Sequence, residues 1–105
     1  MSDERRSDKR VTAHLPAKWE GMSGIHEARI EDISAKGCFV NTAGRVEVSQ
    51  VINLEIELPY GEWFPVRGEV TSYQPGIGFG IMFQTLTEEQ SAILRKLISD
   101  REAFH

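Results

Sequence analysis

An alternating run in the middle of the chain constrains the fold more than any other feature. Between Val51 and Leu58 every second residue is a large aliphatic one: Ile52, Leu54, Ile56 and Leu58. A period of two is typical of a β-strand with one buried face. Pro59 and Gly61 follow at once, and both residue types favour turns. The run therefore predicts a half-buried strand that ends at a turn.

Five further segments also predict strands: Val11–Trp19, His26–Ile33, Cys38–Val40, a run from Phe64 to Thr71, and Ile77–Phe83. In the last of these the expected inward face consists of Ile77, Phe79, Ile81 and Phe83. No helical pattern separates the strands, which argues against a βαβ arrangement. We therefore expect an all-β fold with one C-terminal helix, with the strands forming a barrel or a sandwich.

The helix is predicted at about 87–101. Thr87 and Gln90 have the spacing of a capping box, and two glutamates between them suit the positive end of the helix dipole. An apolar stripe at helical spacing follows, formed by Ile93, Leu94, Leu97 and Ile98. We expect this stripe to cover the barrel, and docking onto a partner is the alternative.

One break in the alternation predicts a local irregularity. Ala28 and Ile30 share a parity, whereas Ile33 has the opposite one. If Ile30 and Ile33 both face the core, a bulge or a change of face must lie near Glu31 and Asp32. Bulges often redirect side chains next to binding sites.

The composition is that of an ordinary globular domain, with 40% hydrophobic and 27% charged residues among 105. Its apolar runs are far shorter than the roughly 20 residues that span a bilayer. The first ten residues, MSDERRSDKR, contain no apolar stretch of a secretory signal. Cys38 is the single cysteine and so has no intramolecular disulfide partner, which is typical of a reducing compartment. We expect a cytoplasmic domain with no membrane insertion.

The charge distribution points to a small anionic partner. The net charge of −4 argues against general binding of a nucleic acid polymer, for which a basic surface supplies most of the affinity. Four cations nevertheless gather near the N-terminus: Arg5, Arg6, Lys9 and Arg10. We interpret residues 1–10 as a flexible arginine-bearing arm and residues 11–105 as the folded barrel with its helix. A solvated terminus without a binding role is the alternative.

No arrangement typical of an enzyme occurs. His14, His26 and His105 are far apart, and none has metal-ligand spacing with Cys38 or a carboxylate. A P-loop, a nucleophile elbow and an HExxH helix are all missing from the sequence. The glycines of residues 76–80 lack GxGxxG spacing; they either let a flat ligand approach the outer face of a strand or mark barrel curvature. We expect no catalytic residue, no cofactor and no metal ion.

Two segments carry the residues best suited to binding. Arg6 and Arg10 are four residues apart, and arginine can clamp a phosphate or stack on a base. The second segment has the pattern D-x-S-x-x-G, formed by Asp32, Ser34 and Gly37. A carboxylate accepts hydrogen bonds from a guanine edge, a hydroxyl can reach a neighbouring group, and glycine permits a close backbone approach. On its own this second segment is most typical of an ordinary Asx or serine turn.

Taken together, the two segments and the late strand G-F-G-I-M-F at 78–83 resemble the PilZ family of cyclic di-GMP receptors over essentially the whole chain. The resemblance implies a six-stranded antiparallel β-barrel with a C-terminal helix and a ligand site on the outer surface. By position, Arg6 and Arg10 would hold phosphate and guanine, Asp32 and Ser34 would read a guanine edge, and Gly37 would shape the turn. The implied cyclic di-GMP site consists of Arg5, Arg6, Arg10, Asp32, Ser34, Gly37 and Gly78.

Two residues of the arm modify this expectation. Asp8 lies between the motif arginines and could pair with Lys9 or Arg10, at a cost of about 0–1 kcal/mol for an exposed pair. Arg5 directly precedes the motif, and in the family this position bears on whether one ligand or a stacked pair binds. The resemblance favours the pair here.

The expected function is that of a cyclic di-GMP receptor and adaptor in bacterial second-messenger signalling. The arm would become ordered over the ligand and change the surface offered to an unidentified downstream protein partner. The alternative is a PilZ-like protein-interaction adaptor with weak or no nucleotide binding. An RNA-binding barrel is a third hypothesis, which the acidic body disfavours.

Overall fold

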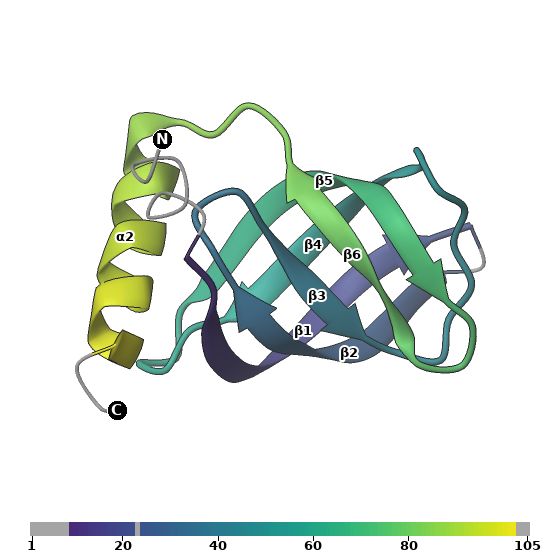
Figure 1. Ribbon diagram of the computed structural model, residues 1–105, viewed down its shortest axis with the longest axis horizontal. Coiled ribbons are helices and arrows are strands. Elements are labelled where there is room, and N and C mark those ends of the chain that lie inside the picture. Colours follow the sequence, from purple (N-terminus) through teal and green to yellow (C-terminus); the bar gives the residue numbers. More distant parts are fainter. Residues whose placement is uncertain (1–8, 23, 103–105) are drawn as a thin grey trace.

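The computed structural model describes residues 9–22 and 24–102, which form six strands and one helix (Figure 1). The elements in chain order are β1 (Val11–Gly21), β2 (Gly24–Ile33), β3 (Gly37–Asn41), β4 (Val51–Glu57), β5 (Trp63–Gln74), β6 (Gly78–Phe83) and α2 (Glu88–Glu102). The predicted strands and the C-terminal helix are therefore confirmed. The structure extends β1 and β5 at their C-terminal ends beyond the ranges expected from the sequence.

The strands form a closed antiparallel barrel in the order β1-β2-β3-β6-β5-β4. Alternation suits this closure, because the strands turn most of their apolar side chains inward. In β1, for example, Ala13, Leu15 and Ala17 are buried while the residues between them are exposed. β4 alternates in the same way, so Ile52, Leu54 and Ile56 reach the same core. The predicted six-stranded antiparallel β-barrel is thus confirmed.

The helix α2 covers one end of the barrel (Figure 1). Leu94 and Leu97 are buried in the core, and Ile93 and Ile98 pack against it as partly buried residues. The predicted capping box is present: Gln90 N donates to Thr87 Oγ1 at 3.0 Å, and Thr87 N donates to Gln90 Oε1 at 2.9 Å. The apolar stripe therefore serves the core, as expected.

The two tryptophans have different surroundings. Trp19 is buried, stacks on His26 with ring centroids 4.4 Å apart, and meets Phe79 edge to face at 5.1 Å. Its Nε1 donates to Thr42 Oγ1 at 3.2 Å, which satisfies the buried indole donor. Trp63, at the start of β5, is 41% exposed, and the Lys18 ammonium lies 5.2 Å from its ring centroid.

The expectation for Ile77 was wrong. Ile77 is 52% exposed and lies in the β5–β6 turn, where its N–H donates to Gln74 O at 3.0 Å. Gly76 adopts a φ of 79°, which reverses the chain immediately before Ile77. The strand and its inward alternation begin only at Gly78, with Phe79, Ile81 and Phe83 in the core.

In the described part of the chain, α2 is too short and too polar to cross a bilayer, and no other helix is present there that could do so.

The buried thiol of Cys38 leads to a prediction about stability at high pH. Burial raises the pKa of this thiol well above its ordinary value of 9.0. The folded chain therefore keeps a proton that the unfolded chain releases above about pH 9. We expect the free energy of unfolding to fall as the pH rises above this point, by up to about 1.4 kcal/mol per pH unit from this group.

Urea unfolding at pH 8, 9 and 10 measures this effect, with Cys38→Ala as the control. The control is expected to be less stable throughout because of the smaller side chain, but to lose less stability between pH 9 and 10. Equal losses in both proteins would show that Cys38 does not contribute.

Candidate functional site

An ion pair joins the two segments that the sequence singled out. Arg10 precedes β1, and its Nη1 donates to Asp32 Oδ1, near the end of β2, at 2.6 Å. The pairing of β1 with β2 brings them together, because Val11 lies opposite Ile33. Both side chains are about half exposed, so a ligand can reach them. A ligand can therefore displace one partner of the pair at little cost, since an exposed ion pair contributes only about 0–1 kcal/mol.

A bulge places Asp32 at the surface. The register between β2 and β3 shifts between Ile30 and Asp32, so Glu31 is the extra residue. As predicted from the parity of the sequence, Ile30 and Ile33 both lie in the core and are fully buried. The bulge therefore lets the strand bury both isoleucines and leaves Asp32 half exposed, next to the arm.

The loop from Ser34 to Gly37 is a serine turn. Ser34 Oγ accepts hydrogen bonds from the N–H groups of Lys36 at 3.1 Å and Gly37 at 3.3 Å. Ser34 N donates to Gly37 O at 2.8 Å, and the side chain is almost fully buried. The hydroxyl thus fixes the shape of the loop. The alternative interpretation of this motif as a serine turn holds for the described structure, and such a turn can also present groups to a ligand.

Gly37 is required by the next strand. A Cβ atom at this position would overlap the carbonyl oxygen of Ile81 in β6. Gly37 therefore does permit a close backbone approach, and in this structure the group that approaches is β6. A hydrogen bond from β6 also holds the loop, because Phe83 N donates to Lys36 O at 2.7 Å.

These elements surround a surface hollow of about 500 Å³, which we call the motif hollow. It is lined by Arg10, Ser34, Lys36, Gly37, Thr71, Ile81 and Met82. Two cations and the loop's backbone form its polar side, and Met82, which is 50% exposed, offers an apolar surface. Asp32 borders the hollow through its ion pair with Arg10. Such a surface can hold a phosphate beside a flat base.

The sequence did not identify Lys36, Thr71 or Met82 as site residues. Met82 carried a signal, because its parity is opposite to that of Ile81 and Phe83 and so predicts exposure. Thr71 is the extra residue of a bulge between Val70 and Ser72 in β5. This bulge, like the pairing of β5 with β6, depends on contacts distant in the sequence.

Besides Asp32, which borders the motif hollow without lining it, three predicted site residues are not placed there. Gly78 lies at the other end of β6, opposite Asn41, where a Cβ atom would overlap the carbonyl oxygen of Val40. Its close approach is thus to β3 and not to the hollow. Arg5 and Arg6 lie outside the described residues, and so does Asp8.

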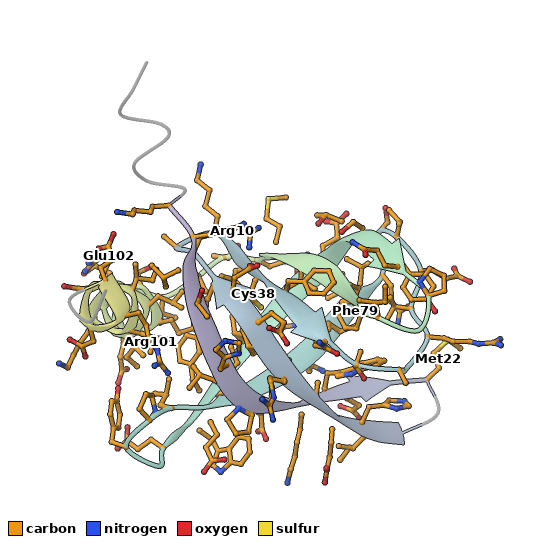
Figure 2. All side chains as sticks on the ribbon, turned by 60° about the horizontal axis from the view of Figure 1, so that its bottom comes forward. Arg10, Met22, Cys38, Phe79, Arg101 and Glu102 are labelled. Atoms are coloured by element: carbon orange, nitrogen blue, oxygen red, sulfur yellow. The ribbon has the colours of Figure 1, made fainter. Side chains whose placement is uncertain are left out.

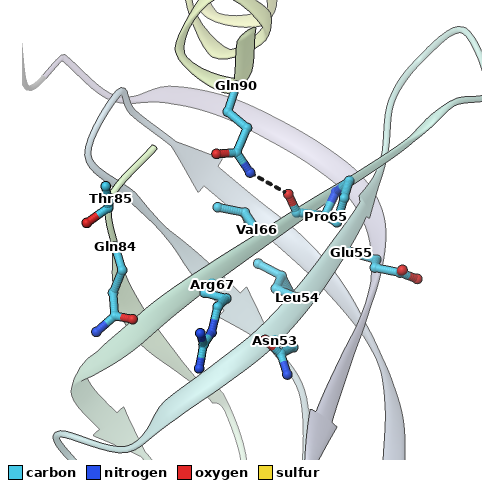
Figure 3. A pocket seen from close by; sticks show the side chains of 9 residues that line it. All are labelled: Asn53, Leu54, Glu55, Pro65, Val66, Arg67, Gln84, Thr85 and Gln90. Carbon is cyan, nitrogen blue, oxygen red and sulfur yellow. Dashed lines mark hydrogen bonds between the residues drawn. The ribbon is translucent and has the colours of Figure 1, made fainter. Parts of the chain in front are cut away.

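A second hollow, of about 510 Å³, lies over the strands β4 and β5 (Figure 3). Its charged side chains are Glu55 and Arg67, and Gln90 of α2 donates across it to Pro65 O at 3.0 Å. None of the predicted site residues lines it. The two hollows are similar in size. Residues of both sequence motifs line the motif hollow, whereas no motif residue lines the second hollow.

Within residues 9–22 and 24–102, no group of three or more His, Cys, Asp or Glu side chains has a geometry that could hold a metal ion.

Comparison with known proteins assigns the chain to a family. The family model of the PilZ domain matches residues 4–100. No curated protein sequence matches the chain significantly.

Solved structures show the same fold at low sequence identity. The PilZ domain of YcgR from Escherichia coli, solved with c-di-GMP, is 16% identical with a TM-score of 0.78, over 94% of this chain and 92% of that one. The PilZ domain of CeSA from a cellulose-synthesizing bacterium is 19% identical with a TM-score of 0.70, over 90% and 98%.

The Bacillus subtilis inhibitor of motility, MotI/DgrA, is 16% identical with a TM-score of 0.78 over 94% of this chain. The match covers only 51% of MotI/DgrA, so the present chain corresponds to about half of that protein. At these identities, the likeness establishes the fold.

The overlap at Gly37 predicts the effect of a single methyl group. We expect Gly37→Ala to destabilise the protein by roughly 1–3 kcal/mol, because the new Cβ must push β6 away from the loop. Gly80→Ala is the matched control in β6, since its Cβ would meet the side-chain hydroxyl of Ser72, which can rotate away. Urea unfolding of both variants measures the difference. A Gly37→Ala protein as stable as Gly80→Ala would contradict the close approach.

Proposed function

This chain belongs to the PilZ domain family, and on that premise we propose that it binds cyclic di-GMP in the motif hollow and acts as a non-enzymatic receptor and adaptor in signalling. The observation that carries the proposal is the convergence of Arg10 with the Ser34–Gly37 loop around one hollow of suitable chemistry. The cyclic di-GMP in the similar YcgR structure supports the same ligand class.

The proposed binding step is an exchange of partners. A phosphate of the ligand takes the place of Asp32 at the guanidinium of Arg10, and Asp32 becomes free to accept from the N1–H and amine of a guanine. The exchange gives up an exposed ion pair worth about 0–1 kcal/mol. Each new charge-assisted hydrogen bond contributes about 1.5–3 kcal/mol, so the balance favours the ligand. Lys36 adds a second cation beside the phosphate.

The remaining predicted residues enter as proposals. Arg5 and Arg6 would reach the ligand as the arm closes over it, and Arg5 would favour a stacked ligand pair. Ser34 would contact a guanine edge from the hollow wall, and Gly37 would keep the loop in shape. Gly78 lies too far along β6 to touch a ligand in the motif hollow, and its proposed contribution is to the β3–β6 pairing.

An ion pair connects the proposed arm movement to the helix. Lys9 Nζ lies 2.8 Å from Glu102 Oε2, in the last turn of α2. Lys9 is next to Arg10, so repositioning Arg10 onto a phosphate would also disturb this contact. We propose that ligand binding thereby changes the surface at the end of α2 that a downstream protein partner would contact.

The first test is isothermal titration of the wild type and Arg10→Ala with cyclic di-GMP, using GTP and cyclic di-AMP as competitor controls. We expect selective binding near micromolar, about −8 kcal/mol, and a loss of about 10- to 100-fold in Arg10→Ala, equal to one or two charge-assisted bonds. The stoichiometry distinguishes one ligand from a pair. Arg29→Ala, an exposed arginine of β2 outside the hollow, is expected to bind normally.

Binding that is undiminished in Arg10→Ala would refute the proposed site. Failure of the wild type to bind would favour the alternative function, an adaptor that recognises proteins without nucleotide.

The proposed ordering of the arm has its own test. We expect backbone amides of residues 1–10 to exchange hydrogen more slowly with saturating cyclic di-GMP, because their N–H groups become protected under the closed arm. Exchange in the strand β4, remote from the motif hollow, is the internal control. Arm exchange that is equally fast with and without ligand would rule out closure.

A further inference from the structure

We propose that a hollow between the β4–β5 loop and the last turns of α2 is a docking site for a partner-protein segment that presents an apolar side chain beside a carboxylate. This hollow, called the helix-end hollow, has a volume of about 370 Å³ and is lined by Pro59, Tyr60, Leu97, Asp100 and Arg101. It shares no lining residue with the motif hollow, so the proposal does not depend on nucleotide binding.

The apolar part of the hollow is preformed. Leu97 is almost fully buried beneath it, and Pro59 and Tyr60 form the wall contributed by the loop. The loop is held by two backbone bonds, from Leu58 N to Glu62 O at 2.7 Å and from Gly61 N to Leu58 O at 2.9 Å. A fixed apolar wall lowers the cost of ordering on binding, so an apolar side chain is the natural occupant.

The polar part of the hollow consists of Asp100 and Arg101, and one donor of Arg101 lacks an acceptor. Arg101 Nε is buried, and within the described residues it has no hydrogen-bond partner. The neighbouring carboxylates have other contacts, since Asp100 lies 3.4 Å from Lys96 Nζ and Glu102 lies 2.8 Å from Lys9 Nζ. Figure 2 shows Arg101 and Glu102 on different sides of α2. A buried N–H without an acceptor is unfavourable, and a carboxylate is the partner that a guanidinium binds best.

Exposed aromatic residues beside the hollow indicate that the carboxylate belongs to a protein. Tyr60 is 57% exposed, and Trp63, at the start of β5 just after the loop, is 41% exposed. Trp63 does not line the hollow, so a small acid that filled the hollow would leave it uncovered, whereas we expect a peptide that continues from Tyr60 toward β5 to cover both rings. Tyrosine, tryptophan and arginine are the residue types that dominate binding energy at protein interfaces.

The test is an NMR titration of the full chain with the blocked peptide acetyl-Gly-Leu-Glu-Leu-Gly-amide. Its glutamine analogue removes only the charge, and 4-methylpentanoate supplies an apolar carboxylate without a peptide. We expect the glutamate peptide to shift the Arg101 Nε–H and the Trp63 indole N–H signals, and to bind about tenfold more tightly than either control.

Two variants and one control complete the design. Arg101→Gln is expected to bind both peptides equally. Tyr60→Ala, which removes an exposed side chain and leaves the core intact, is expected to weaken binding of both. Arg95→Gln, an exposed arginine of the same helix, is expected to behave as wild type.

Three outcomes would overturn the proposal. Equal affinity for the glutamate and glutamine peptides would show that the site does not recognise a carboxylate. Methylpentanoate binding as tightly as the glutamate peptide would make it a small-acid site. A dimeric wild type that Tyr60→Ala turns monomeric in sedimentation would make a second copy the occupant.

Discussion

Two glycines let β3 and β6 approach each other closely, and both the barrel and the motif hollow depend on this approach. Gly37 begins β3 against Ile81, and Gly78 begins β6 against Val40, at opposite ends of the same pairing. A side chain at either position would overlap a backbone carbonyl and separate the strands. Because β3 and β6 are neighbours in the closed barrel, their separation would also open the wall of the hollow.

The site combines a rigid floor with side chains whose ion pairs a ligand can displace. The serine turn, the two bulges and the β3–β6 pairing fix the floor, with Ser34 and Ile81 buried. Among the described residues, Arg10 and its neighbour Lys9 are held by exposed ion pairs, to Asp32 and Glu102. Such pairs are weak and screened by salt, so an anionic ligand can displace them at little cost. This division suits a receptor that must respond to its ligand without unfolding.

Local patterns predicted most of the fold. The alternation of residues 51–58, the capping box at Thr87 and the parity change between Ile30 and Ile33 each depend on neighbours in the sequence, and all three are present in the structure. The error at Ile77 has a local cause too, because a period of two cannot reveal the turn that Gly76 makes with a positive φ. The D-x-S-x-x-G motif also marked a loop that lines the motif hollow.

The rest of the site could not be predicted from the sequence, because it depends on the register of strands that are distant in the sequence. Thr71 and Met82 reach the hollow through the pairing of β5 with β6, and Arg10 meets Asp32 across 22 residues of sequence. Gly78 is part of the same motif strand, but its place at the far end of β6 follows only from the pairing with Asn41.

The central claim is that the ligand binds in the motif hollow and not in the similar hollow over β4 and β5. Titration of ¹⁵N-labelled protein with cyclic di-GMP tests it directly, because each hollow has its own amide signals. We predict shifts at Arg10, Lys36, Gly37 and Met82, with Asn53, Arg67 and Gln84 unchanged. Shifts confined to the second group, or no shifts at saturating ligand, would contradict the account.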